Sequence, residues 1–245
     1  MKSLFRKLHR WIGLALALQI LAWMLSGFYF TLFPIETIRG EHLTQESETL
    51  AEVALEHMIS PQSAWDGLLE ASLGEIELLE MSFLRRFNLD WYRITVNLDG
   101  QVYTRLVNAS DGTLMPPMSR EVALQRAQAL LLESQTPLAM EWVTSQHPGG
   151  EYRGSVLPVW RAVYEEPESL SLYLDPYTGD LLARRTDRWR IFDFLWMLHI
   201  MDYETRSDFN TRLLMVASSL GFFVAFSGLV YWAMSSRLLR RRRRV

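Results

Sequence analysis

Cysteine is absent from the sequence of 245 residues. Its absence excludes disulfide bonds, thiolate metal sites and a cysteine nucleophile, and it is compatible with an oxidising compartment. The chain also lacks a phosphate-binding P-loop, a dinucleotide-binding glycine motif, and the GxSxG and HExxH signatures of hydrolases. The sequence therefore gives no support to a hydrolase or to a nucleotide-dependent enzyme.

Formal charge is missing from two long apolar stretches, residues 11–33 and 213–234. At a rise of about 1.5 Å per residue the first stretch is about 35 Å long, enough to cross the hydrocarbon of a bilayer with some tilt. The hydrophobic region of a signal peptide is shorter, about 7–15 residues, so the first stretch is interpreted as an uncleaved anchor. We predict two transmembrane helices, with the small pairs Ser26-Gly27 and Ser227-Gly228 as helix-packing positions in the lipid bilayer.

Acidic residues are missing from both ends of the chain, which carry lysine and arginine instead. Residues 1–10 contain four basic residues and residues 235–245 contain six, so the remaining residues 11–236 carry 15 − 28 = −13 charges. Because positively charged flanks stay in the cytoplasm, we predict cytoplasmic termini and a periplasmic middle region in a bacterial inner membrane. An arginine run directly after an apolar span favours lipid headgroups as its partner, and nucleic acid is not expected.

The region between the two apolar stretches contains two segments with similar patterns. Residues 34–118 include "SPQSAWDGLLEASL", "WYRITVNLDG" and "NASDG", and residues 119–188 include "REVALQRAQALLLE", "VWRAVY" and "DPYTG". Each segment suggests a helix, with Ser119 as the N-cap of the second one, then alternating strands and an Asp or Gly turn. We predict an α+β domain that contains a diverged internal repeat.

The second segment resembles a PepSY domain in its tryptophan strand "VWRAVY" and in the turn and return strand of "LYLDPYTGDLL". The stretches "LHRWIGLALALQILAWMLSGFYF", "FLWMLHIMDYETR" and "LGFFVAFSGLVYW" are similar to the helices of PepSY-associated transmembrane proteins. The resemblance covers nearly the whole chain. It implies an integral membrane protein in which two transmembrane helices flank a periplasmic domain of two PepSY-like repeats, each a helix plus an antiparallel sheet.

His9 lies between the basic N-terminus and the first apolar stretch. Gly13 follows one helical turn later on the same face, and its missing side chain would leave room for haem coordinated through the imidazole. Arg6, Lys7 and Arg10 would then pair with the haem propionates. The alternative is that this histidine has no ligand, since glycine is common in membrane spans.

Five residues with aromatic or imidazole rings share one face of a helix predicted at residues 189–204: Trp189, Phe192, Trp196, His199 and Tyr203. One interpretation is an amphipathic helix in the headgroup region, where tryptophan and tyrosine are favoured. The other is a haem site in which His199 is the axial ligand, Trp196 lies along the haem and Asp202 binds the second ring nitrogen. Both interpretations remain open at this stage.

One haem b cannot bind both histidines, because His9 and His199 are predicted at opposite boundaries of the bilayer. Two-fold pairing of two copies would place each histidine near its symmetry mate and so create one bis-histidine site at each face. A haem-binding function therefore predicts a homodimer or a partner membrane subunit.

The resemblance implies two classes of function, because PepSY-associated membrane proteins include haem-containing reductases that act in iron and siderophore uptake. In the first, electrons pass from a cytoplasmic donor through haem at His9 and His199 to an acceptor such as a ferric chelate. In the second, the periplasmic domain is a non-catalytic module that recognises a peptide, a protease or an envelope protein. Whether the chain is an enzyme is left open by the sequence.

Overall fold

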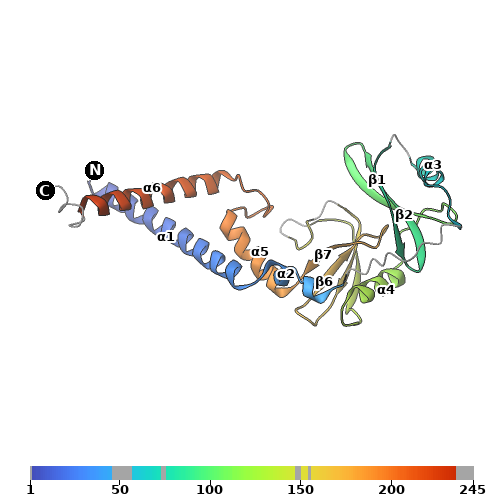
Figure 1. Cartoon of the computed structure of the whole chain (residues 1–245). Coiled ribbons are helices and arrows are strands. Elements are labelled where there is room, and N and C mark those ends of the chain that lie inside the picture. The colour runs from blue at the N-terminus through green and yellow to red at the C-terminus, as the bar shows by residue number, and fades with distance from the viewer. Residues whose placement is uncertain (1, 46–56, 73–75, 147–149, 154–155, 236–245) are drawn as a thin grey trace, which may run out of the picture. The chain divides into compact units, whose positions relative to one another are not determined.

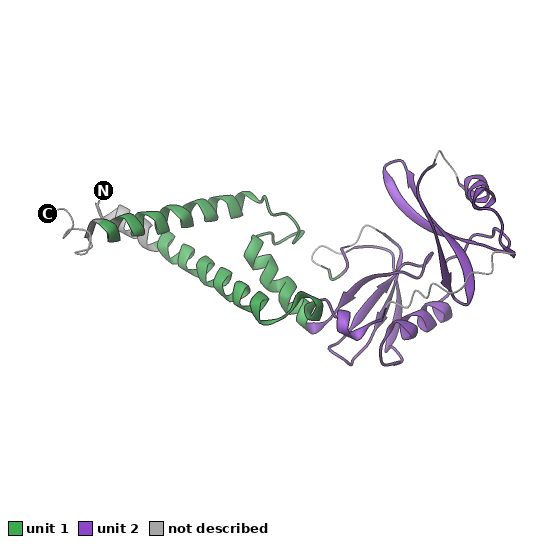
Figure 2. Cartoon of the chain, viewed as in Figure 1, with its two compact units in different colours: residues 1–38, 147–151, 188–245 green, residues 39–146, 152–187 purple. Residues whose placement is uncertain are grey.

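The computed structural model describes residues 2–45, 57–72, 76–146, 150–153 and 156–235 (Figure 1). The chain divides into two compact units, which Figure 2 distinguishes by colour. Unit 1 comprises residues 1–38, 147–151 and 188–245, and unit 2 comprises residues 39–146 and 152–187. Unit 1 contains the long apolar helices, and unit 2 contains both β-sheets.

Unit 1 contains the two predicted apolar helices, α1 (Lys2–Leu32) and α6 (Arg212–Ser235). The segments Trp11–Leu32 and Arg212–Val230 are long and apolar enough to cross a membrane, and only 11% and 6% of them are buried inside the protein. A helix of a soluble core would bury its apolar residues, whereas these helices expose most of them. The sequence predicted the ends of both helices to within about two residues, apart from the N-terminal extension of α1 to Lys2.

Helix α5 (Asp187–Ile200) runs from the carboxyl end of α1 toward the start of α6 (Figure 1). The short helix α2 (Ile35–Ile38) follows α1 in the chain. Its predicted range of 189–204 was too long, so Tyr203 lies beyond the helix. Met201 adopts a φ of 54°, which leaves the right-handed helical region. The Asp202 carboxylate then accepts backbone hydrogen bonds from Glu204, Thr205, Ser207 and Asp208. Burial raises the pKa of Asp202, but these bonds and the Thr205 hydroxyl outweigh it and hold the pKa well below its usual value.

The first half of unit 2 is a helix followed by a three-stranded antiparallel sheet. Its elements are α3 (Pro61–Ala71), β1 (Ile76–Arg86), β2 (Leu89–Leu98) and β3 (Gln101–Asn108), with sheet order β1-β2-β3. Helix α3 begins at Ser60, whose Oγ accepts a hydrogen bond from the Ser63 N–H at 3.0 Å. Ala64 and Leu68 are buried on the helix and pack into a core with residues of β2 and β3, including Ile94.

The second half of unit 2 is also a helix followed by an antiparallel sheet, here of four strands. The elements are α4 (Arg120–Leu130), β4 (Ala139–Val143), β5 (Val159–Val163), β6 (Ser171–Leu174) and β7 (Leu181–Arg185), with sheet order β4-β5-β6-β7. The short helix η1 (Glu41–Leu43) comes before α3 in the chain. The predicted N-cap of α4 is confirmed, since Ser119 Oγ accepts a hydrogen bond from the Val122 N–H at 3.3 Å. The observed fold class is α+β, as predicted.

The turns "NASDG" and "DPYTG" have the same backbone hydrogen bonds. The Gly112 N–H donates to Asn108 O at 2.9 Å, and the Gly179 N–H donates to Asp175 O at 2.9 Å. Both glycines adopt a left-handed φ, 78° and 72° respectively, which a side chain disfavours. The two halves therefore share the order of helix, antiparallel strands and turn, although the first half has only the bridge of Leu114 to β3 where the second half has β7.

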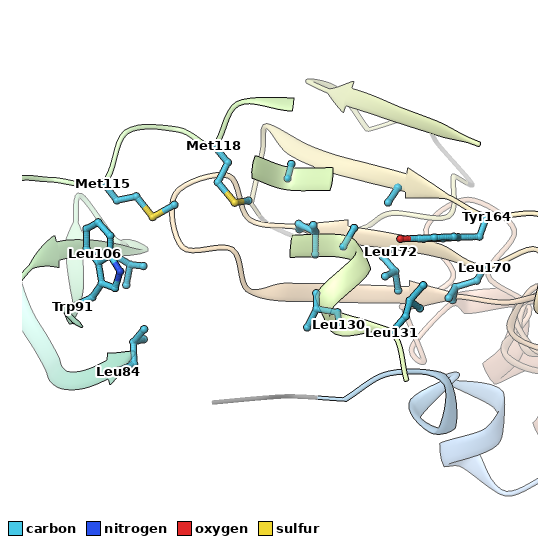
Figure 3. Packing of buried hydrophobic residues seen from close by; sticks show 14 residues of the cluster. Leu84, Trp91, Leu106, Met115, Met118, Leu130, Leu131, Tyr164, Leu170 and Leu172 are labelled. Carbon is cyan, nitrogen blue, oxygen red and sulfur yellow. The ribbon is translucent and has the colours of Figure 1, made fainter. Parts of the chain in front are cut away.

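One hydrophobic cluster joins the two halves of unit 2 (Figure 3). Leu84, Trp91 and Leu106 belong to the first half, and Leu130 and Leu172 belong to the second. Because both halves contribute buried side chains to the same core, neither half buries all its apolar surface without the other.

An ion cluster around Asp180 also joins the two halves. Asp180 follows the second turn, and its carboxylate accepts hydrogen bonds from Arg86 Nη1 and Arg93 Nη2, each at 2.8 Å. Thr178 Oγ1 donates a third bond at 2.8 Å. Burial raises the pKa of Asp180, but the two arginines and the hydroxyl outweigh burial and leave the pKa below its usual value.

We expect Asp180→Asn to lower the free energy of unfolding at neutral pH by about 3 kcal/mol, because it leaves the Arg86 and Arg93 charges without their shared carboxylate. The lowered pKa makes this stabilisation complete above about pH 5, and it is lost as the pH falls through about 3.9 toward the folded-state pKa. The difference between variant and wild type should therefore narrow at pH 3.5. Chemical unfolding of the full chain in nanodiscs, followed by tryptophan fluorescence, measures this at both pH values.

The matched control is Asp111→Asn in the corresponding turn, where the exposed carboxylate accepts hydrogen bonds from Thr113 and contacts no arginine among the described residues. This variant should lose much less stability than Asp180→Asn. An equal loss for Asp180→Asn at pH 7 and pH 3.5 would contradict an origin in the ionised carboxylate.

Candidate functional site around His199

The carboxyl end of α5 is bound by polar side chains from α1 and from the start of α6. The carbonyl oxygens of Leu198, His199 and Ile200 accept hydrogen bonds, in this order, from Gln19 Nε2 at 3.1 Å, Trp23 Nε1 at 2.8 Å and Thr211 Oγ1 at 3.5 Å. The last four carbonyls of a helix have no partner inside the helix, and an unpaired carbonyl is costly in an apolar environment. Gln19 and Trp23 therefore allow α5 to end beside an apolar span.

Aromatic rings form a continuous stack along α5. Phe192 and Trp196 stack with centroids 5.9 Å apart, and Trp196 and His199 stack with centroids 6.3 Å apart and planes 3° from parallel. Phe30 of α1 packs against all three rings, at 4.8, 6.2 and 5.9 Å from Phe192, Trp196 and His199. The predicted ring-bearing face is thus present for these three residues, and it faces α1, while Tyr203 is not part of it.

A buried hydroxyl is hydrogen-bonded to the His199 ring. Ser26 is fully buried, and its Oγ lies 2.7 Å from His199 Nδ1. The same hydroxyl lies 2.9 Å from the Trp23 carbonyl oxygen, and when it donates its single hydrogen there, it accepts a hydrogen bond from the ring. In that arrangement Nδ1 carries the hydrogen of the neutral imidazole and Nε2 carries the lone pair. No hydrogen-bond partner of Nε2 occurs in the part of the chain that the structure describes.

The His199 ring borders a cavity of about 560 Å³. The lining residues come from α1, α5, α6 and the segment between α5 and α6: Trp23, Trp196, His199, Ile200, Phe209, Leu214 and Ser218. Most of these side chains are apolar, and the volume is in the range of about 300–1,000 Å³ that is typical of small-molecule sites. The cavity thus combines one imidazole with apolar walls.

The segment between α5 and α6 holds Trp196 in place. Trp196 Nε1 donates to the Arg206 carbonyl at 3.2 Å, and the Phe209 ring meets Trp196 edge-on with centroids 5.4 Å apart. Arg206 forms an ion pair with Asp193, which is buried on α5. One wall of the cavity is therefore fixed by polar contacts to α5 as well as by packing.

The expectation that Asp202 binds the His199 ring is wrong. The Asp202 oxygens accept hydrogen bonds from the residues of their own turn, and the ring nitrogen Nδ1 is bonded to Ser26. The role of Ser26 was missed, because its pairing with Gly27 suggested helix packing alone. The available signal was the scarcity of polar residues in this span, since Gln19 and Ser26 both contact α5.

The structure does not bring His9 and His199 together within one chain. His9 is a residue of α1, and the structure describes its backbone but not its side chain. Ser26, which holds His199, follows His9 by 26 − 9 = 17 residues of continuous helix, or about 26 Å along the axis. A Cβ added to Gly13 would meet no atom within 4 Å, so the surface beside it is open.

We expect Ser26→Ala to reduce the stability of the full chain by about 1 kcal/mol, because His199 Nδ1 loses its buried hydrogen-bond partner. Ser227→Ala is a matched control, since Ser227 Oγ donates to the Val224 carbonyl at 2.9 Å in the same way but the residue is exposed. Its stability should stay at the wild-type value. Unfolding in detergent micelles, followed by tryptophan fluorescence, measures both, and equal effects would exclude a specific role for the Ser26 bond.

The family described as PepSY-associated TM region has a sequence model that matches residues 6–245. Comparison with curated proteins and with solved structures gave no match. The family match covers nearly all of the chain, including both apolar helices, the two sheets and the His199 site. The chain is therefore a membrane protein that belongs to the PepSY-associated TM region family.

Proposed function

We propose that this protein binds haem b through His199 and carries electrons across the bacterial inner membrane. The observation that supports this most directly is the Ser26 bond, which engages Nδ1 and leaves Nε2 without a hydrogen-bond partner among the described residues. Histidines that bind metals are usually fixed in this way through their other ring nitrogen.

The residues around His199 fit an apolar, planar group. Trp196 and Phe30 hold the imidazole plane by packing, while Phe209 and Leu214 provide apolar walls of the cavity. Haem, when bound, supplies an iron that accepts and releases one electron. The chain would contribute the His199 imidazole as a ligand, the orientation of its ring and apolar side chains beside the haem.

A single chain supplies one imidazole to this site, so a second axial ligand requires another copy or a partner membrane subunit. In a two-fold homodimer, His199 and His9 each lie near their symmetry mates, which gives two sites at opposite ends of α1. The axial separation of about 26 Å between His9 and Ser26 agrees with sites near opposite faces of a bilayer. Gly13 leaves open surface beside the His9 end.

The proposed direction of transfer follows from the charges at the chain ends. The basic ends support a cytoplasmic location of both termini, which would leave unit 2 in the periplasm. Electrons would enter from a cytoplasmic donor at the His9 end and leave near His199 to an acceptor such as a ferric chelate. The alternative function, a membrane-anchored module that recognises a peptide, protease or envelope protein, needs neither histidine.

We expect the purified full chain, produced with a haem precursor, to show a b-type band in the dithionite-reduced minus oxidised absorption spectrum. His199→Ala and His9→Ala should each remove about half of the band, because each removes one of two sites. Ser26→Ala should weaken haem binding at the His199 site by about tenfold, since it removes the group that orients the ligand.

His42→Ala is the control for these variants, because His42 belongs to unit 2 and 41% of its side chain is exposed. Its spectrum should equal that of the wild type. Absence of a haem band from the wild-type protein would refute electron transfer. An unchanged cellular phenotype of both His9→Ala and His199→Ala, at normal membrane levels, would also refute it and would favour the anchored module.

The orientation is tested separately by reporter fusions. Alkaline phosphatase, which is active only after export, should be active when fused after residue 120 and inactive when fused to the C-terminus. The reverse pattern would place unit 2 in the cytoplasm and would contradict the proposed direction of electron flow.

A further inference from the structure

Unit 2 contains a second cavity of about 480 Å³, and all the residues that line it belong to unit 2. Six apolar residues of α3, the first sheet and the segment after it form most of its wall: Leu68, Ile76, Val96, Leu98, Leu114 and Met115. Tyr177, from the "DPYTG" turn of the second half, also lines it. The cavity therefore lies between the two halves of unit 2.

Arg105 is the charged residue among the side chains that line this cavity. Its guanidinium carbon lies 4.1 Å from the ring centroid of Tyr177 and 5.7 Å from that of Tyr103, and its Nη1 donates to the Thr104 carbonyl at 2.9 Å. Two aromatic rings and one carbonyl thus hold the guanidinium plane, and cation–π contacts do not use its N–H groups. A guanidinium has five N–H donors, so donors remain for a ligand.

Other arginines of unit 2 differ from Arg105 in their partners. Arg86 and Arg93 share the Asp180 carboxylate, and Arg161 pairs with Glu141. Within the described residues, Arg105 has no carboxylate within salt-bridge distance. A half-buried arginine beside an apolar cavity, held by rings instead of by a carboxylate, is suited to bind an anion brought by a ligand.

We propose that this cavity binds an aliphatic monocarboxylate of the fatty-acid type, with its carboxylate on Arg105 and its chain between α3 and the first sheet. One cation at one side of an apolar cavity matches a ligand with one anionic end. The rings of Tyr103 and Tyr177 face the guanidinium. The remaining wall is largely aliphatic, which favours an aliphatic body over an aromatic one.

The charge balance favours a monoanion over a phosphate dianion. Asp175 belongs to the same turn as Tyr177; burial raises its pKa, and the charge of Arg105 is among the effects that oppose this rise. The two groups therefore interact, and the Asp175 carboxylate reduces the positive field that a dianion would need. A ligand here would contact residues of both halves and so stabilise unit 2 by mass action. The inference does not depend on haem binding.

The test is a calorimetric titration of the full chain in phosphatidylcholine nanodiscs with decanoate, after subtraction of the heat from empty nanodiscs. We expect saturable binding at one site per chain. Arg105→Gln should weaken binding by about tenfold or more, because a charge-assisted hydrogen bond is lost. Methyl decanoate, which has the same chain without the charge, should bind the wild type as weakly as decanoate binds Arg105→Gln.

Two further variants make the outcome decisive. Ala71, at the end of α3, lines the cavity and is exposed. Ala71→Phe should therefore fill the cavity and abolish binding while leaving the fold intact. Arg120→Gln removes an exposed arginine elsewhere in unit 2 and should bind as the wild type does. Absence of saturable binding, equal binding by Arg105→Gln, or undiminished binding by Ala71→Phe would each overturn the proposal.

Discussion

Unit 1 depends on the pairing of backbone polar groups beside apolar spans. Hydrocarbon offers no hydrogen bonds, so a helix that ends next to a span must find donors for its last carbonyls within the protein. Gln19 and Trp23 supply two of these donors from the middle of α1. Because they hold the carboxyl end of α5, the His199 ring lies beside Ser26, and the partner of Nδ1 follows from the position of a helix end.

Arginine residues show how the same side chain takes different roles in unit 2. Arg86 and Arg93 converge on Asp180, and with the shared core they hold the two halves together. Arg105 lies in the same sheet, on β3, whereas Arg86 is on β1 and Arg93 on β2. Two tyrosine rings and a backbone carbonyl hold the Arg105 guanidinium. The first arrangement neutralises charge inside the protein, whereas the second preserves a charge at a cavity wall.

Local features of the fold could be predicted from the sequence, because short segments determine them. The absence of charge defined both spans, Ser119 marked the start of α4, and the glycines of "NASDG" and "DPYTG" marked turns that need a positive φ. The periodicity around His199 also identified the correct face of α5. It could not show whether that face meets lipid or protein, since both favour aromatic residues. The Ser26–His199 bond joins residues 173 positions apart, and no local pattern encodes it.

The two cavities select ligands by opposite means. The cavity beside His199 combines one imidazole with apolar rings, and a neutral imidazole suits a metal centre in an apolar group better than a carboxylate. The wall beside Arg105 offers N–H donors and a positive charge, which suits an anion and cannot coordinate a metal ion. One occupant cannot satisfy both sites. Among the described residues, different side chains line the two cavities, so each proposed ligand would meet its own set of side chains.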